Sequence, residues 1–171
     1  MSMRKIILTG ASGSGKSTTL EELAKRGFTT MTEVARPILE LGITNVKDRQ
    51  NMMYCAQLYG EQMLPKNSDI VFLDRGVFDY LGFSKQLGVQ TSRTIIGLLA
   101  KQKYDKVFCL DSLPSFKQDG IRIEHNKEES DAFLNSVLRE YRSHGYTIDH
   151  VPVMSPIDRV NYILQNINTY K

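Results

Sequence analysis

Eight consecutive residues near the start of the chain have the types and spacing of a phosphate-binding loop. Residues 10–17 read GASGSGKS and match the pattern G-x-x-x-x-G-K-[ST] at every fixed position. Glycines let the backbone wrap closely around a polyphosphate, a lysine neutralises the outer phosphates, and a serine hydroxyl is a ligand for Mg²⁺. We therefore expect this loop to bind a nucleoside triphosphate, with the lysine also catalytic and the first serine after it at the metal. The residues assigned to it are Gly10, Ala11, Ser12, Gly13, Ser14, Gly15, Lys16, Ser17 and Thr18.

The flanking segments place this loop between a strand and a helix. Residues 5–9 form a short apolar run that predicts a buried strand. Residues 17–26 carry apolar side chains at helical spacing, and Gly27 follows at a position where it ends a helix. A loop in this setting turns its backbone N–H groups and the positive end of the helix dipole toward an anion. The setting therefore favours a true phosphate site over a glycine-rich turn that only resembles one.

A second chemically capable group follows a later apolar segment. Residues 70–73 are apolar and are followed by Asp74 and Arg75. A carboxylate at the end of such a strand helps to hold Mg²⁺ or its water shell in P-loop proteins, so we assign Asp74 to the metal and to catalysis. Arg75 has the fork geometry to bind a phosphate or carboxylate of a second substrate, and we assign it to the acceptor. A structural ion pair with a nearby acid explains Arg75 equally well.

Strand-like and helix-like segments alternate along the chain, which predicts a parallel sheet with helices on both faces. We predict the three-layer α/β P-loop NTPase fold, with five strands in the order 2-3-1-4-5, as a single domain over residues 1–171. Ligands bind at the carboxyl ends of the strands in such sheets. The predicted strands are residues 5–9, 28–32, 70–73, 106–110 and 147–151, and the predicted helices are residues 17–26, 37–42, 48–64, 78–87, 92–103, 130–143 and the segment that starts at Ser155.

Composition and charge argue against several classes of protein. The formal net charge of +3, from 22 basic and 19 acidic residues, is too small to predict a nucleic-acid partner. No apolar stretch is long enough to cross a membrane and no secretory signal is visible, so we expect a cytoplasmic protein. Cys55 and Cys109 are expected to be buried, reduced thiols, and the apolar residues between Met52 and Leu64 to be mainly a packing surface. The sequence does not indicate the oligomeric state.

The motifs, taken in order, resemble those of nucleoside and nucleotide kinases. Asp74 and Arg75, followed by Gly76 and by Asp79-Tyr80, are similar to the D-R-x motif of these enzymes. More closely, the chain resembles a family of small P-loop ATPases related to the kinase domain that phosphorylates ribosylnicotinamide. The resemblance covers most of the chain and rests on residues 10–17, 27–28, 33–36, 73–76, 104–108, 119–122, 141, 145–146 and 151–152.

The resemblance implies roles for four further residues. Glu33 stands where related kinases place an acid near the acceptor hydroxyl or the water shell of the metal, which assigns it to catalysis; a helix-start acid interacting with the dipole is the alternative. Arg36 is assigned to the acceptor, or else is a solvated helix residue. Arg122 lies in a polar segment, residues 114–129, which corresponds to a lid that closes over the nucleotide. A plain surface loop is the alternative. Such lids often carry more than one arginine, whereas Arg122 is the one arginine of this segment. Pro152 corresponds to a loop that packs against adenine, and a structural turn explains it equally well.

Two functions follow from these assignments. The first is a kinase with ATP as substrate, Mg²⁺ as cofactor and a small nucleoside- or nucleotide-like acceptor, in which Lys16 and Arg122 stabilise the moving phosphoryl group. The second is a switch or binding module that hydrolyses ATP or GTP slowly and acts through a protein partner. Residues 45–48 and 126–129 both miss the N-K-x-D guanine motif, and the chain is short for a ring-forming ATPase with a helical lid domain. The identity of the acceptor is not indicated.

Overall fold

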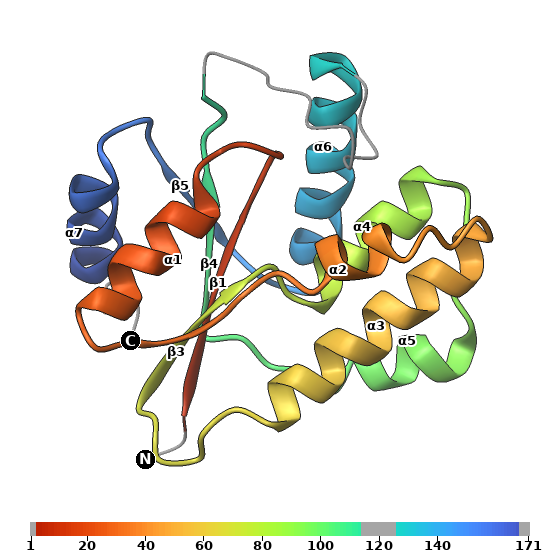
Figure 1. Ribbon diagram of the computed structural model, residues 1–171, viewed down its shortest axis with the longest axis horizontal. Helices are drawn as coiled ribbons and strands as arrows, with labels where there is room; N and C mark the ends of the chain where they lie inside the picture. The colour runs from red at the N-terminus through yellow and green to blue at the C-terminus, as the bar shows by residue number, and fades with distance from the viewer. Residues whose placement is uncertain (1–2, 114–125, 168–171) are drawn as a thin grey trace.

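Five parallel strands form one sheet at the centre of the chain (Figure 1). Their order is β2-β3-β1-β4-β5 and helices cover both faces, which confirms the predicted fold class and strand order. The computed structural model describes residues 3–113 and 126–167. The strands are β1 (Arg4–Gly10), β2 (Thr29–Met31), β3 (Ile70–Asp74), β4 (Lys106–Leu110) and β5 (Ile148–Val151). The helices are α1 (Lys16–Lys25), α2 (Ala35–Glu40), α3 (Val46–Gln62), α4 (Val77–Gln86), α5 (Arg93–Leu99), α6 (Lys127–Ser143) and α7 (Pro156–Asn166).

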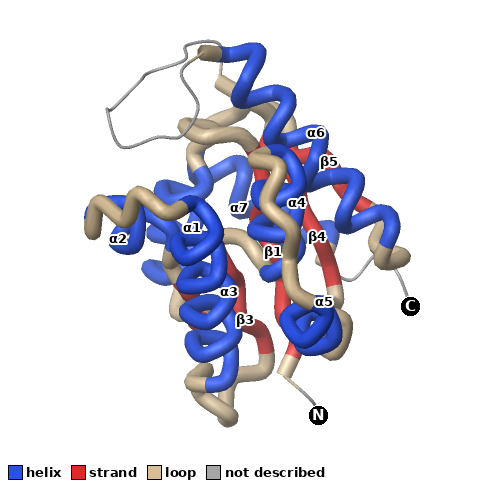
Figure 2. Tube along the Cα trace, turned by 90° about the vertical axis from the view of Figure 1, so that its right-hand side faces the viewer, coloured by secondary structure: helices blue, strands red, loops and turns tan. Residues whose placement is uncertain are grey.

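Two apolar clusters lie on opposite faces of the sheet. Successive residues of a strand point to opposite faces, so Ile7 belongs to one cluster whereas Ile6 and Leu8 belong to the other. Helices α1 and α7 cover the face of Ile6 and Leu8, and helices α2 to α6 cover the face of Ile7. Figure 2 views the second face, with these helices in front of the strands. Burial on both faces explains why the central strands are continuous apolar runs.

Helices α2 and α3 begin two residues earlier than the sequence predicts. Helix α2 begins at Ala35, and Pro37 lies within its first turn, where a helix makes no use of the missing N–H. Helix α3 begins at Val46 because the side chain of Asn45 accepts hydrogen bonds from two backbone N–H groups of the first turn, at 3.0 and 3.2 Å. The predicted starts missed both the asparagine cap and the tolerance of a first turn for proline.

Helix α6 begins at Lys127, three residues before the predicted start. The side chain of Asn126 caps it by accepting a hydrogen bond from the backbone N–H of Glu129 at 2.8 Å. The last three residues of the segment assigned to a lid, 127–129, are therefore the first turn of this helix. Residues 114–125, which include Arg122, lie outside the described residues.

The predicted packing surface of α3 is wrong for part of its apolar side chains. Four of them face solvent: Met52, Cys55, Tyr59 and Met63. The buried face combines apolar side chains with three polar ones that are hydrogen-bonded, namely Gln50, Gln57 and Glu61. Because polar groups occupy core positions, the apolar residues do not mark the buried face. The predicted burial is therefore wrong for Cys55 and confirmed for Cys109. Burial raises the pKa of the Cys109 thiol to about 12.

Candidate functional site

The glycine-rich loop joins the central strand β1 to helix α1 at the carboxyl end of the sheet. Gly15 precedes the helix with a φ of 86°, in the left-handed region that favours glycine. At Gly10 a Cβ atom would lie 2.7 Å from the carbonyl oxygen of Leu110 in the neighbouring strand β4. Glycine is thus required at Gly15 by backbone conformation and at Gly10 by close packing, which places the loop tightly on the edge of the sheet.

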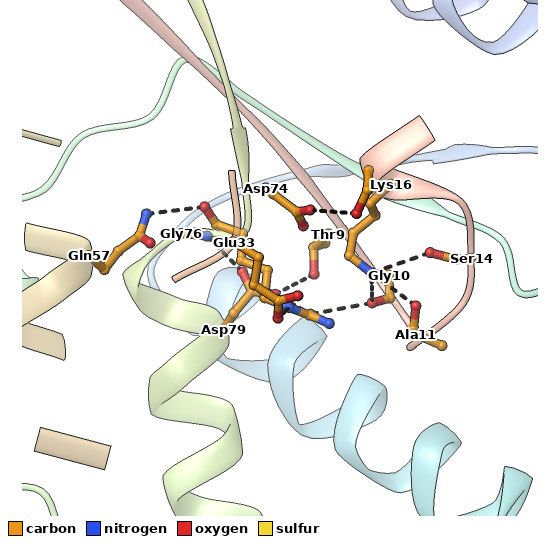
Figure 3. A network of polar contacts seen from close by, with 12 residues as sticks. Thr9, Gly10, Ala11, Ser14, Lys16, Glu33, Gln57, Asp74, Gly76 and Asp79 are labelled. Carbon is orange, nitrogen blue, oxygen red and sulfur yellow. Dashed lines mark hydrogen bonds and ion pairs between the residues drawn. The ribbon is translucent and has the colours of Figure 1, made fainter. Parts of the chain in front are cut away.

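The ammonium group of Lys16 turns into the loop itself (Figure 3). Its Nζ donates hydrogen bonds to the carbonyl oxygens of Gly10 and Ala11, at 3.0 and 2.9 Å, and to the hydroxyl of Ser14 at 3.4 Å. Burial, together with the positive charge of Arg75, lowers the pKa of Lys16 to about 8. A bound polyphosphate would replace these neutral carbonyl oxygens with negatively charged oxygens as hydrogen-bond partners of the Lys16 ammonium.

Asp74 and Ser17 form a pair with the chemistry of a cation site. Asp74 ends β3 beside the loop, and the Ser17 hydroxyl donates to its Oδ2 at 3.3 Å. Its other oxygen, Oδ1, is buried and receives no hydrogen bond within the described residues. Burial raises the pKa of Asp74 above its usual value, against the opposing charges of Lys16 and Arg75. A hydroxyl beside a carboxylate with a free oxygen suits a hard cation, so these residues fit the predicted Mg²⁺.

The described residues contain no group of three or more His, Cys, Asp or Glu side chains that would hold a metal ion by themselves. Mg²⁺ usually keeps several waters and binds through one or two protein ligands plus substrate phosphates. The protein's share of the site would then be Ser17 and Asp74.

Arg75 is the centre of an ion-pair network with Glu33 and Asp79. Its Nε donates to Oε1 of Glu33 at 2.8 Å, and its Nη1 donates to Oδ1 of Asp79 at 3.2 Å and to the carbonyl oxygen of Gly10 at 3.3 Å. The guanidinium carbon lies 5.0 Å from the centre of the Phe83 ring. Its φ of 73° is in the left-handed region, which is uncommon for a residue other than glycine. The structural ion pair considered for Arg75 is therefore present.

Asp79, on α4, anchors this network; the sequence analysis included it in the similarity to the D-R-x motif but assigned it no function in the site. Its carboxylate is fully buried. Besides Arg75, it accepts hydrogen bonds from the hydroxyls of Thr9 and Tyr141, both at 2.6 Å, and from the backbone N–H of Gly76 at 3.0 Å. An acid four residues after an arginine was visible in the sequence, but this spacing is common on helix surfaces and does not indicate burial.

A cavity of about 380 Å³ connects the loop with helices α2, α3 and α4. Its volume is in the range of small-molecule sites. The loop supplies a polar wall, and three side chains from the helices supply an apolar wall: Leu39, Met53 and Phe83. Glu33, Arg36 and Arg75 also line the cavity, together with Ala35 and Leu113. The cavity thus has a polar half beside the loop and a partly apolar half beside the helices.

Residues 5–159 match the family described as an AAA domain. The chain belongs to this family. No curated protein sequence is significantly similar to this AAA domain.

Among the described residues, no helix has the length and apolarity needed to cross a membrane.

Solved structures of similar fold include nucleoside and nucleotide kinases. A deoxyadenosine kinase from M. mycoides is 19% identical, with a TM-score of 0.66 over 97% of this chain and 100% of that chain. NadR in complex with NR is 18% identical, with a TM-score of 0.79 over 99% of this chain and 52% of that chain, so the AAA domain spans about half of NadR. A thymidylate kinase from Ehrlichia chaffeensis is 13% identical, with a TM-score of 0.67 over 96% of this chain and 98% of that chain. At such identities the likeness establishes a P-loop kinase fold.

The structure brings most of the predicted site residues of this AAA domain together. The cavity is lined by six loop residues and three residues from later in the chain: Ser12, Gly13, Gly15, Lys16, Ser17, Thr18, Glu33, Arg36 and Arg75. Asp74 joins them through its hydrogen bond with Ser17. Pro152 is exposed after β5 and is not among the residues that line the cavity. A further arginine, Arg159 of α7, donates a hydrogen bond to the carbonyl oxygen of Ser14 in the loop. No sequence motif singled it out.

Proposed function

We propose that this AAA domain is a phosphotransferase that moves the γ-phosphoryl group of ATP to a hydroxyl group of a small acceptor. The observation that carries the proposal is the shared cavity: Glu33, held by Arg75 at 2.8 Å, lines the same space as Lys16 and Ser17. A carboxylate fixed beside a phosphate loop is placed to orient an attacking hydroxyl. The apolar wall and the kinases of similar fold favour a nucleoside-like acceptor.

The phosphate side of the reaction falls to the loop. Lys16 and the backbone N–H groups around it would bind the β- and γ-phosphates and neutralise the charge of the transition state. Ser17 and Asp74 would hold Mg²⁺, which supplies further neutralisation of the phosphate oxygens when bound. Arg122 and Pro152 keep their predicted roles over the phosphates and against the base, and Arg36 keeps its predicted role with the acceptor.

Glu33 is suited to orientation of the acceptor more than to early proton removal. Burial raises its pKa, but the charges of Arg75 and Lys16 outweigh burial, so the pKa lies below its usual value and the group is a weak base. Phosphoryl transfer passes through a loose transition state that needs little removal of the proton beforehand. Oε1 is bonded to Arg75, which leaves Oε2 to serve as the acceptor for another donor. Oε2 is thus the atom that would accept the bond from the acceptor hydroxyl.

Arg75 would act mainly by positioning Glu33. Its charge is shared between two carboxylates, those of Glu33 and Asp79, so little of it is left to bind an anionic acceptor. We therefore assign Arg75 to holding the Glu33 carboxylate in its orientation within the cavity, through the bond from its Nε to Oε1.

The test begins with the unmodified protein, ATP, Mg²⁺ and pools of nucleosides, nucleotides and small metabolites, with phosphorylated products identified by mass spectrometry. We expect one class of acceptor to be phosphorylated. The variant K16M should lose nucleotide affinity and turnover together. The variant E33Q should keep its affinity for ADP and lose transfer by about 10²-fold, the cost of a poorly oriented reacting group.

The matched control is E40Q, which alters an exposed acid at the end of helix α2 that does not line the cavity. It should behave as the unmodified protein in both assays. Unchanged transfer by E33Q would remove Glu33 from the mechanism. Hydrolysis of ATP without phosphorylation of any acceptor, stimulated by a protein partner, would favour the switch in place of the kinase.

A further inference from the structure

Arg159 lies beneath the phosphate-binding loop. It belongs to the second turn of helix α7, which begins at Pro156, and only 3% of its surface is exposed. Its Nη1 donates a hydrogen bond to the carbonyl oxygen of Ser14. The guanidinium also occupies the space beside Gly15, where an added Cβ atom would lie 2.5 Å from Nη1. The last helix and the loop are thus fitted to each other through one side chain.

The positive charge of Arg159 is poorly compensated. Its Nε and Nη2 are buried without a hydrogen-bond partner, and Arg159 forms no ion pair in the part of the chain that the structure describes. Asp111, at the end of β4, acts on it electrostatically, but the Asp111 carboxylate is engaged with His150 at 3.0 Å. A guanidinium stays charged even when buried. Buried donors without acceptors are costly, so their presence here calls for a role other than stability.

The hydrogen bond from Arg159 to the Ser14 carbonyl also fixes the orientation of the whole Ser14–Gly15 peptide group. The carbonyl of Ser14 and the N–H of Gly15 belong to the same planar trans peptide and point in opposite directions. Since Arg159 holds the carbonyl on the side of α7, the N–H of Gly15 is directed to the other side, and Gly15 lines the cavity there. An N–H group aimed in this way is what a phosphate oxygen needs at the start of a helix.

We propose that Arg159 is a positioning residue for the nucleotide phosphates: it orients the Ser14–Gly15 peptide and places an uncompensated positive charge beneath the phosphate-binding loop. The inference rests on the proposed binding of nucleotide and adds a residue from the opposite end of the chain to it. It makes no use of the acceptor or of the transfer step. Its effect depends on phosphates, because both the directed N–H and the buried charge act on negative oxygens and neither acts on a base or ribose.

The experiment measures affinities for ADP by calorimetry and for AMP by competition against ADP, with Mg²⁺ present, for four proteins. These are the unmodified chain, R159Q, R159K and R26Q. Arg26, which follows α1, is a matched control because it is also an arginine that bonds between the N-terminal part of the chain and α7: its Nη1 donates to Oδ1 of Asn161 at 2.7 Å, at an exposed position away from the loop. Thermal unfolding of each variant shows whether it is folded.

We expect R159Q to lower the affinity for ADP by about tenfold or more, a typical effect of losing a charged donor, and to lower the affinity for AMP less. R159K should lie between R159Q and the unmodified protein, because an ammonium can still donate to the Ser14 carbonyl. R26Q should bind both ligands normally. If R159Q does not fold, the fall of the ADP-to-AMP affinity ratio in R159K decides the question.

Normal ADP affinity in a folded R159Q or R159K variant would overturn the proposal. An equal loss for AMP and ADP would overturn it as well, because Arg159 would then act on the base or on the general integrity of the fold. Failure of the unmodified protein to bind either ADP or ATP is a different result, which would overturn the proposed function itself.

Discussion

Replacement of Asp79 by asparagine tests the network that fixes Arg75 and Glu33. Oδ1 of Asp79 accepts from the Thr9 hydroxyl and from Arg75, and Oδ2 accepts from the Gly76 N–H and from the Tyr141 hydroxyl. Asparagine has nearly the same shape, but one oxygen becomes an NH₂ group that only donates. A hydroxyl can rotate away from such a donor, whereas a backbone N–H or a guanidinium cannot. In either orientation of the amide, a donor therefore faces a donor.

The size of the effect follows from the burial of this network. Removing one charge from a buried ion pair costs about 3–5 kcal/mol, a figure that already includes the unsatisfied donor. We therefore expect D79N to lower the free energy of unfolding by about 3–5 kcal/mol. For a chain of this size, that corresponds to a fall in Tm of roughly 6–20 °C. It would be a large share of the roughly 5–15 kcal/mol that stabilises a typical domain.

Urea unfolding followed by circular dichroism measures this loss, and D131N is the control. Asp131 also pairs with a cation four residues away, Lys127 at 3.0 Å, but both side chains are exposed, so D131N should change stability by less than about 0.5 kcal/mol. In D79N the phosphoryl-transfer rate should fall more than the affinity for ADP, because Arg75 would hold Glu33 less firmly. A D79N variant within about 1 kcal/mol of the unmodified protein would refute the view of Asp79 as a buried charged anchor.

Two further predictions concern the phosphate side of the cavity. Because burial and Arg75 lower the pKa of Lys16 to about 8, and because the ammonium must be protonated to bind phosphate, affinity for ADP should be level below that pH and fall by up to about tenfold per pH unit above it. Calorimetry across this range measures the fall; K16R should flatten it, and a level profile in the unmodified protein would contradict the assignment. The variant D74N should raise the Mg²⁺ concentration needed for half-maximal activity by roughly 10–100-fold while leaving metal-free ADP binding nearly normal. An unchanged Mg²⁺ requirement in a metal titration would exclude Asp74 from the cation site.

The parts of the site that are local in sequence were the ones the sequence predicted best. The loop needs glycines, a lysine and a serine within one short stretch, so its chemistry and its place between β1 and α1 are visible without any knowledge of packing. Asp74 is nearly as local, because an acid after an apolar strand ends at the same sheet edge as the loop, and the register pairs Leu8 of β1 with Asp74 of β3. In both cases, backbone topology alone brings the residues together.

The parts that were missed depend on contacts between distant segments. Arg159 reaches the carbonyl of Ser14 across 145 residues of sequence, and Asp79 meets Tyr141 across 62 residues. Neither contact leaves a pattern within a window of sequence. Helix α3 misled the prediction for a related reason, because Nε2 of buried Gln57 donates to Glu61 and to the backbone carbonyl of Arg75, and the second partner is supplied only by the tertiary structure.

The two sides of the cavity are held from opposite faces of the sheet. Helices α7 and α6 lie on opposite faces of the sheet (Figure 1). Arg159 ties the phosphate loop to α7 on one face, whereas a chain of hydrogen bonds of 2.6–3.2 Å runs from Tyr141 of α6 through Asp79 and Arg75 to Glu33 on the other. The sheet separates these two packing layers, and Arg159 shares no hydrogen-bond partner with the Tyr141 chain among the described residues. Energetic effects at sites without shared partners usually add. Disturbance of the α7 layer should therefore alter mainly nucleotide affinity, and disturbance of the α6 layer mainly transfer to the acceptor, with a smaller effect on affinity through the bond from Arg75 to Gly10 of the loop.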